Sequence, residues 1–146
     1  MPTLRDSRDR ADLLRRIDAL TPEHQGRWGT LTAARMMCHV ADQLRVALGE
    51  MPSKDRTTLL SRTLVKRLVL SGWLPIPKGR VRTVPEMLST PETAWHDDVA
   101  TLHRLIDDLA RVEDTAPHPL FGPLRPHEWG RLSALHLDHH LRQFGV

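Results

Sequence analysis

The sequence predicts an all-α protein, a four-helix bundle with an extra short helix or extended excursion. Leucine, alanine and arginine are abundant, and all three residues favour helices. No stretch alternates apolar and polar residues as a strand does, and no segment repeats. The longer helical segments have the lengths of bundle helices. At 146 residues, the chain is expected to form one domain over residues 1–146.

The first predicted helix covers residues 7–20. Its apolar residues Leu13, Ile17 and Leu20 recur on one face, and arginine and aspartate occupy the others. Proline and glycine then interrupt the pattern, so residues 21–31 are expected to form a loop.

The clearest helical pattern covers residues 32–49. Thr32 is a suitable N-cap, Gly49 occupies the position that favours glycine after a helix, and neither glycine nor proline lies between them. A third helix is expected near residues 57–70. Glycines and prolines then predict an extended excursion over residues 71–88.

A fourth helix is expected to begin with Thr90 as its N-cap, Pro91 at the first helical position and Glu92 in the first turn. A proline-rich loop follows this helix. The last helix is predicted over residues 126–144.

The charge pattern and the single cysteine exclude several classes of protein. The net charge is +3, but basic and acidic residues are interspersed, so no nucleic-acid partner is expected. Cys38 is the only cysteine, which excludes an intrachain disulfide and a multi-cysteine zinc site. The N-terminus lacks a signal-peptide pattern and no apolar run could span a bilayer, so we expect a cytoplasmic protein with no membrane partner.

The C-terminal helix carries three histidines within five residues. At 100° per residue, His136 and His140 lie roughly 40° apart and share a face with Trp129 and Gln143, whereas His139 lies on the flank. One helix can offer two imidazoles to one metal ion at this i,i+4 spacing. Nine histidines give roughly 0.5 such pairs by chance, so a pair of hydrogen-bonded core histidines is the alternative.

His39 is the candidate for a third ligand. Its helical face also carries Met36, Gln43 and Val46, so the imidazole should point inward. Three inward histidines from two helices would form a site with open coordination positions. Because this face lacks a carboxylate, Zn²⁺ or Ni²⁺ is favoured over Mg²⁺ or Ca²⁺. Histidines in predicted loops or at a helix start receive no role: His24, His118 and His127.

Further residues are candidates for contacts around the three histidines or for a pocket wall: Asp42, Gln43, Trp129 and Gln143. Asp42 could orient His39 or face water. Cys38 lies about 100° around the helix from His39, and we interpret it as a buried structural thiol. No catalytic residue is assigned.

Two segments carry a resemblance to a known family. WGTLTAARMMCHVADQ resembles a W-x-x-(L/M)-(T/S)-x-x-Q-M-L-x-H-L-A-D segment of the DinB/YfiT-like superfamily, and HLDHHLRQ is similar to its closing H-x-x-x-H-x-x-Q. HPLFGPLRPHEWGRLSALHLDHHLRQFGV resembles the DUF1569 branch. The resemblance implies an up-down-down-up bundle that binds divalent metal through His39, His136 and His140, with Gln143 as the trailing glutamine.

The resemblance also implies a reaction class and partners. It implies a metal-dependent enzyme, a thiol-dependent transferase or isomerase or a hydrolase, with a low-molecular-weight thiol, a small-molecule substrate and a homodimer. Two residues depart from the family pattern: Arg125 removes an N-cap oxygen, and Arg35 replaces a glutamine and is interpreted as a surface change. The competing interpretation is a non-catalytic helical bundle whose histidines are structural or bind metal to stabilise the fold.

Overall fold

The computed structural model describes residues 1–72 and 83–146. Most of the excursion expected at 71–88, residues 73–82, lies outside the described residues. The described residues form helices and no strand, apart from one isolated bridge between His118 and Gly122. The predicted all-α class is therefore confirmed.

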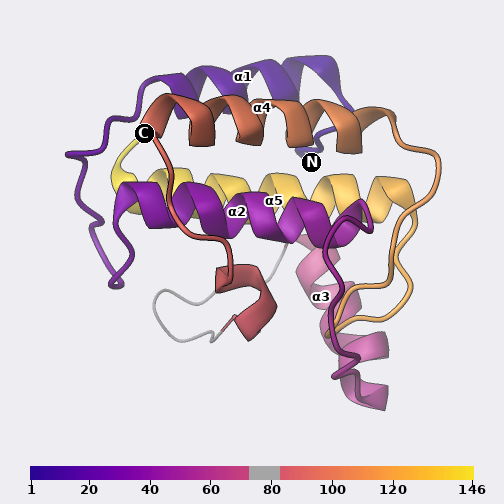
Figure 1. Cartoon of the computed structure of the whole chain (residues 1–146). Helices are drawn as coiled ribbons and strands as arrows, with labels where there is room; N and C mark the ends of the chain where they lie inside the picture. Colours follow the sequence, from indigo (N-terminus) through magenta and orange to yellow (C-terminus); the bar gives the residue numbers. More distant parts are fainter. Residues whose placement is uncertain (73–82) are drawn as a thin grey trace.

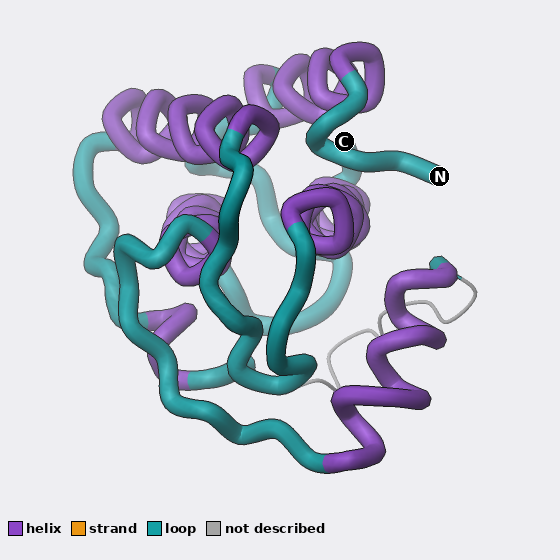
Figure 2. The backbone as a smooth tube through the Cα atoms, turned by 90° about the vertical axis from the view of Figure 1, so that its right-hand side faces the viewer, coloured by secondary structure: helices purple, strands orange, loops and turns teal. Residues whose placement is uncertain are grey.

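Four longer helices pack together: α1 (Ser7–Asp18), α2 (Ala33–Ala47), α4 (Trp95–Arg111) and α5 (Pro126–Phe144). Two of them, α1 and α4, lie above α2 and α5 in both views (Figures 1 and 2). Each layer contacts the other, because α2 packs against α4 and α1 packs against α5. Fully buried apolar side chains from all four helices fill the centre: Ile17, Met36, Leu44, Leu102, Ile106, Leu137 and Leu141.

Three short elements complete the described chain: the π-helical turn η1 (Ser61–Val65), α3 (Lys66–Ser71) and the 3₁₀ turn η2 (Pro85–Leu88). The segment of η1 and α3 extends away from the four longer helices (Figures 1 and 2). None of the helices in the described part of the chain is both long and apolar enough to span a membrane.

Two helices have the ends that the sequence predicts. The Thr32 hydroxyl accepts the Arg35 amide hydrogen at 3.1 Å, and Gly49 follows α2 with a φ of +75°. The helix α5 begins at Pro126 and ends at Phe144. Arg125 supplies no N-cap oxygen, but Glu128 makes the other bond of a capping box, because its carboxylate accepts the Arg125 amide hydrogen at 2.9 Å.

The predicted start of the fourth helix is wrong. It begins at Trp95 rather than after Thr90, with Ala94 at the N-cap position. The Thr90 amide and hydroxyl both donate to the Asp42 carboxylate on α2. The Thr90 hydroxyl oxygen accepts from Arg45 at 3.3 Å, so it is turned toward α2 and caps no helix. The Thr93 hydroxyl instead donates to the Asp98 carboxylate in the first turn of α4, at a distance of 2.6 Å.

The extended conformation expected for residues 71–88 is wrong at residues 85–88, although Val84 before them is extended. Pro85–Leu88 form one turn of 3₁₀ helix, with the Met87 amide donating to the Val84 carbonyl at 3.0 Å. Proline suits this turn because it stands at the first helical position, where its missing N–H has no partner to lose. The turn lies against α2.

Candidate metal centre

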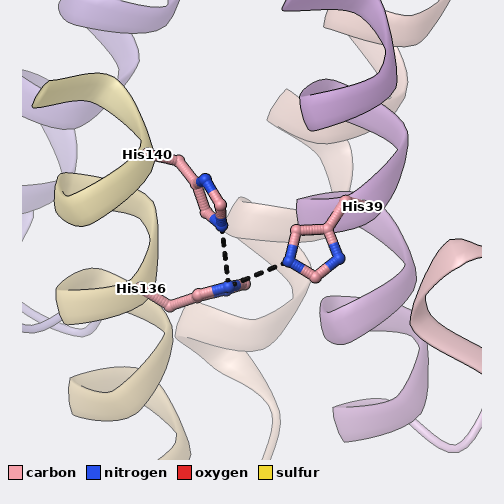
Figure 3. Close-up of side chains that lie close together, drawn as sticks. All are labelled: His39, His136 and His140. Atoms are coloured by element: carbon pink, nitrogen blue, oxygen red, sulfur yellow. Dashed lines mark hydrogen bonds between the residues drawn. The ribbon is translucent and has the colours of Figure 1, made fainter. Parts of the chain in front are cut away.

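Three imidazole rings meet between α2 and α5 (Figure 3). His39 comes from α2, and His136 and His140 come from consecutive turns of α5. The Nε2 atom of His136 lies 3.1 Å from Nε2 of His39 and 3.1 Å from Nε2 of His140. Each ring offers one nitrogen, and the three lie within 4.8 Å of one another. The three histidines could therefore hold one metal ion.

The opposite nitrogen of each ring has its own oxygen partner. Nδ1 of His39 lies 2.8 Å from the Met87 carbonyl oxygen in η2. Nδ1 of His136 lies 3.0 Å from Oε1 of Gln43, and Nδ1 of His140 lies 2.8 Å from Oε1 of Gln143. Since oxygens of this kind only accept hydrogen bonds, each Nδ1 carries the proton and donates.

The protonation of His39 and His140 follows directly from their partners. The Met87 carbonyl can only accept, so Nε2 of His39 keeps its lone pair. The Gln143 amide nitrogen donates to the Trp28 carbonyl at 2.6 Å, which turns Oε1 toward His140 and leaves the lone pair on Nε2 of His140. Both lone pairs point at Nε2 of His136.

Two close nitrogen–nitrogen contacts therefore meet at His136. With Nδ1 of His136 donating to Gln43, all three Nε2 atoms present lone pairs and no hydrogen lies between them. If the Gln43 amide were flipped so that its NH2 group donates to Nδ1 of His136, the His136 proton would lie on Nε2. That proton could form a hydrogen bond with only one of the other two Nε2 atoms. Neutral rings thus leave at least one pair of lone pairs opposed at 3.1 Å, and a cation between them would remove that repulsion.

Burial keeps the three rings neutral. His39 and His140 are only 4% and 8% exposed, and His136 is partly exposed. Burial lowers the pKa of His140 to about 3 and the pKa of His136 well below its usual range, and it also lowers the pKa of His39. Neutral imidazole is the form that binds Zn²⁺ or Ni²⁺, so the donor set fits a divalent ion of this kind.

The two candidate glutamines bond the histidine rings, whereas the described hydrogen bonds of Trp129 and Asp42 go to other residues. Gln43 and Gln143 accept from His136 and His140. Trp129 is fully buried, and its Nε1 donates to the Ala116 carbonyl at 2.8 Å. Asp42 is fully buried rather than facing water, and it bonds Thr90 and Arg45.

Cys38 and His139, each next to a candidate ligand in the sequence, do not belong to the candidate metal group. The described residues form one candidate metal group, which consists of the three histidines without a thiol or a carboxylate. Cys38 is buried, and burial raises the pKa of its thiol to about 11. His139 is half-buried, and its ring packs edge-on against Trp28 and against His140, with centroids 5.7 and 5.2 Å away.

A family model described as "Protein of unknown function (DUF1569)" matches residues 4–145. The chain belongs to the DUF1569 family. No curated protein and no solved structure matches it.

The sequence did not predict that Met87 and Arg35 contribute to the surroundings of His39 in this DUF1569 chain. A backbone carbonyl carries no signal in the sequence, so Met87 could not be found. Arg35, interpreted as a surface residue, donates to the Thr90 carbonyl at 2.6 Å and to the Leu88 carbonyl. A signal for Arg35 did exist, because it lies four residues before His39 and thus on the same face of α2.

His118 is a third residue that received no role from its position in a predicted loop. It is 7% exposed, and its ring stacks on Phe121 with centroids 4.6 Å apart. Its Nδ1 accepts the Leu120 and Phe121 amide hydrogens at 3.1 and 3.3 Å. Burial lowers the pKa of His118 to about 4, so the ring is neutral and its proton lies on Nε2.

Proposed function

We propose that the chain binds one divalent metal ion through Nε2 of His39, His136 and His140, and that this centre is the active site of an enzyme. The opposed lone pairs of the neutral rings carry this proposal, because the fold holds them 3.1 Å apart without a hydrogen for each contact. Three imidazoles from two helices match the ligand number of catalytic zinc sites, which keep a coordination position open. Zn²⁺ and Ni²⁺ are the candidates.

The chain's own residues would orient the ligands. Met87, Gln43 and Gln143 hold protons at the three Nδ1 atoms and so keep each Nε2 directed at the ion. The ion would supply Lewis-acid chemistry, either to activate water or to lower the pKa of a bound low-molecular-weight thiol. These two uses correspond to a hydrolase and to a thiol-dependent transferase or isomerase, each acting on a small-molecule substrate.

We also propose that residues 1–146 form one DinB-like domain, an up-down-down-up four-helix bundle. The course of the helices in Figure 1 supports this topology, because α2 and α4 run in one direction and α1 and α5 in the other. The long connection between α2 and α4 supports it as well, since two neighbouring helices that run the same way need a crossover.

A homodimer is proposed for the assembled protein. Four leucines between residues 59 and 68, over η1, α3 and the two residues before η1, are exposed, and the most exposed of them, Leu59, shows 82% of its surface. Apolar patches of this kind are typical of interaction sites. The leucines are Leu59, Leu60, Leu64 and Leu68. Sedimentation of the wild type and of a Leu59→Glu, Leu64→Glu variant tests this, and a monomeric wild type would refute it.

The second candidate function is a metal site that only stabilises the fold. The burial of His39 and His140 favours it, because a structural ion is usually enclosed. A thiol-conjugation and hydrolysis screen, with and without chelator, separates the two functions. Metal-dependent turnover supports the enzyme, and stoichiometric metal without turnover supports the structural role.

Metal analysis of untagged protein tests the ligand assignment. We expect about one ion per chain in the wild type and in His139→Ala, and nearly none in His136→Ala. His139 is a matched control, since it is a half-buried histidine on the same helix. Free metal at about a thousand times Kd should also raise the free energy of unfolding by about 4 kcal/mol. Equal metal loss in the two variants would refute the assignment.

A further inference from the structure

One face of α2 holds the backbone of residues 87–90. Three polar residues at i, i+4 and i+7 form this face: Arg35, His39 and Asp42. Each makes its contact with a different backbone group of the same short segment. This segment joins η2 to α4 and contains no helix beyond Leu88.

Arg35 and His39 bond the carbonyl groups of the segment. The Arg35 guanidinium donates to the Thr90 carbonyl at 2.6 Å and also to the Leu88 carbonyl. Nδ1 of His39 donates to the Met87 carbonyl at 2.8 Å. The carbonyl that fixes the His39 proton is thus adjacent in sequence to one that Arg35 binds.

Asp42 bonds the other end of the segment. Its carboxylate accepts the Thr90 amide hydrogen at 3.1 Å and the Thr90 hydroxyl hydrogen. Asp42 is fully buried, and Arg45 pairs with it at 2.9 Å. Burying a carboxylate is costly unless its oxygens are paired, so these contacts fix where Thr90 can lie.

The position of the Met87 carbonyl therefore depends on the contacts of the residues that follow it, Leu88 and Thr90. The Met87 carbonyl has to stay within hydrogen-bond distance of His39 for the ring to keep its proton on Nδ1. A 3₁₀ turn of four residues has few internal bonds to hold a carbonyl in place, and η2 has no side-chain cap. The contacts that hold the segment against α2 come from Arg35, at the Leu88 and Thr90 carbonyls, and from Asp42, at Thr90.

We propose that Arg35, Asp42 and Thr90 are positioning residues for His39. They hold segment 87–90 against α2, so that the Met87 carbonyl keeps the His39 proton on Nδ1 and leaves Nε2 directed at His136 and His140. The consequence for metal affinity rests on the proposed function, whereas the consequence for the His39 proton does not depend on metal.

The test compares Thr90→Val with Thr93→Val. Thr90→Val removes the hydroxyl that donates to the Asp42 carboxylate. Thr93→Val, three residues along the chain from Thr90, removes the hydroxyl that donates to the Asp98 carboxylate at 2.6 Å. Both changes have the same size and remove one hydroxyl–carboxylate bond from the same connection. Only the first bond leads to α2. Thr90→Ser restores the hydroxyl and serves as the rescue.

Two readouts are needed: zinc affinity by competition with a chelating dye, and ¹⁵N NMR of the metal-free His39 ring. We expect Thr90→Val to weaken zinc binding about 10- to 100-fold and to move part of the His39 population to the Nε2-protonated form. Thr93→Val should change zinc affinity by less than about threefold and leave the His39 proton on Nδ1. Thr90→Ser should recover both values.

The outcomes separate the two proposals. If the wild type binds no zinc but Thr90→Val shifts the His39 proton, the metal proposal fails and the positioning role stands. If Thr90→Val leaves the His39 proton and zinc affinity at wild-type values, or if Thr93→Val has the same effects, the positioning role is wrong. Should Thr90→Val fail to fold, Arg35→Met removes the donors to the Leu88 and Thr90 carbonyls and is held to the same criteria.

Discussion

The Gln143 side chain joins His140 to the Trp28 carbonyl. Its amide nitrogen donates to Trp28 at 2.6 Å, and its Oε1 accepts from Nδ1 of His140 at 2.8 Å. The loop before α2 therefore determines which nitrogen of His140 is free to bind metal, although this loop contributes no ligand of its own. A residue in this position can be changed without removing a ligand.

Replacing Gln143 by leucine should weaken metal binding. Leucine has a similar size but cannot accept the Nδ1 proton, so the neutral His140 ring can move its proton to Nε2. The expected loss in affinity is about 10- to 100-fold, measured by dye competition. Gln25→Leu is the control, since Gln25 is exposed and should bind metal as the wild type does. Equal affinities for the two variants would show that Gln143 does not orient His140.

Gly29→Ala should disturb the same contact from the opposite side. Gly29 has a φ of +76°, and a Cβ there would lie 2.7 Å from Nε2 of Gln143. Gly49→Ala is the matched control, because its φ is +75° and its Cβ would meet no atom within 4 Å. Both variants should lose about 1 kcal/mol in the free energy of unfolding from the left-handed backbone.

Only Gly29→Ala should also lose metal affinity, because only its Cβ displaces the amide that turns Gln143 toward His140. Chemical denaturation gives the first quantity, and metal titration gives the second. A loss of affinity in Gly49→Ala of the same size would mean that backbone strain, and not the contact with Gln143, is responsible.

Metal affinity should change little between pH 7.5 and pH 5.5. Three histidines with ordinary pKa values would be mostly protonated at pH 5.5, and affinity would fall about a thousandfold. Here burial lowers the pKa of all three rings, that of His140 to about 3, so protons do not compete with the metal in this range. Titrations at both values test this, and a steep fall below pH 6.5 would contradict it.

His118 should contribute to acid denaturation of the metal-free protein. Its folded pKa of about 4 lies below the usual 6.5, so the unfolded chain binds a proton that the folded chain does not. Stability is therefore lost as the pH falls from about 6.5 to about 4, by about 3 kcal/mol at the lower end.

Substituting His118 by asparagine tests this contribution. Asparagine can still accept the Leu120 and Phe121 amide hydrogens, but it does not titrate, so the variant should lose less stability between pH 7.5 and pH 4.5. Urea unfolding at both values gives the difference. His96→Asn is the control, because its side chain is 82% exposed and should leave the acid loss unchanged. An acid loss in His118→Asn equal to that of the wild type would contradict the assignment.

Helical periodicity predicted the parts of the site that depend on local structure. The 100° rotation per residue separated His136 and His140 from His139, and it turned His39 toward them, because both helices have the predicted extents to within about two residues. The same reasoning found Gln143, which shares the face of His140 and bonds it, and Gln43, which shares the face of His39 and bonds His136 on the other helix.

The parts that failed depend on contacts between distant segments. Thr90 has the sequence of an N-cap, yet its hydroxyl donates to Asp42, 48 residues earlier, and accepts from Arg45 on the same helix α2. The contribution of Met87 is a backbone carbonyl, to which no residue type corresponds. His118 lies in a proline-rich loop that folds back into the core, and loop composition alone does not distinguish that course from a solvated one.

His39 and His136 are separated by 97 residues in sequence. An ion bound to both would close a loop of most of the chain, from α2 through α3 and α4 to α5. Because only the folded chain would bring the three Nε2 atoms together, the ion would stabilise the native state by its binding free energy and would not constrain the unfolded chain. Loss of the ion would first weaken the packing of α2 against α5 at the three histidines. Amide hydrogen exchange in these two helices would then report metal occupancy in the cell.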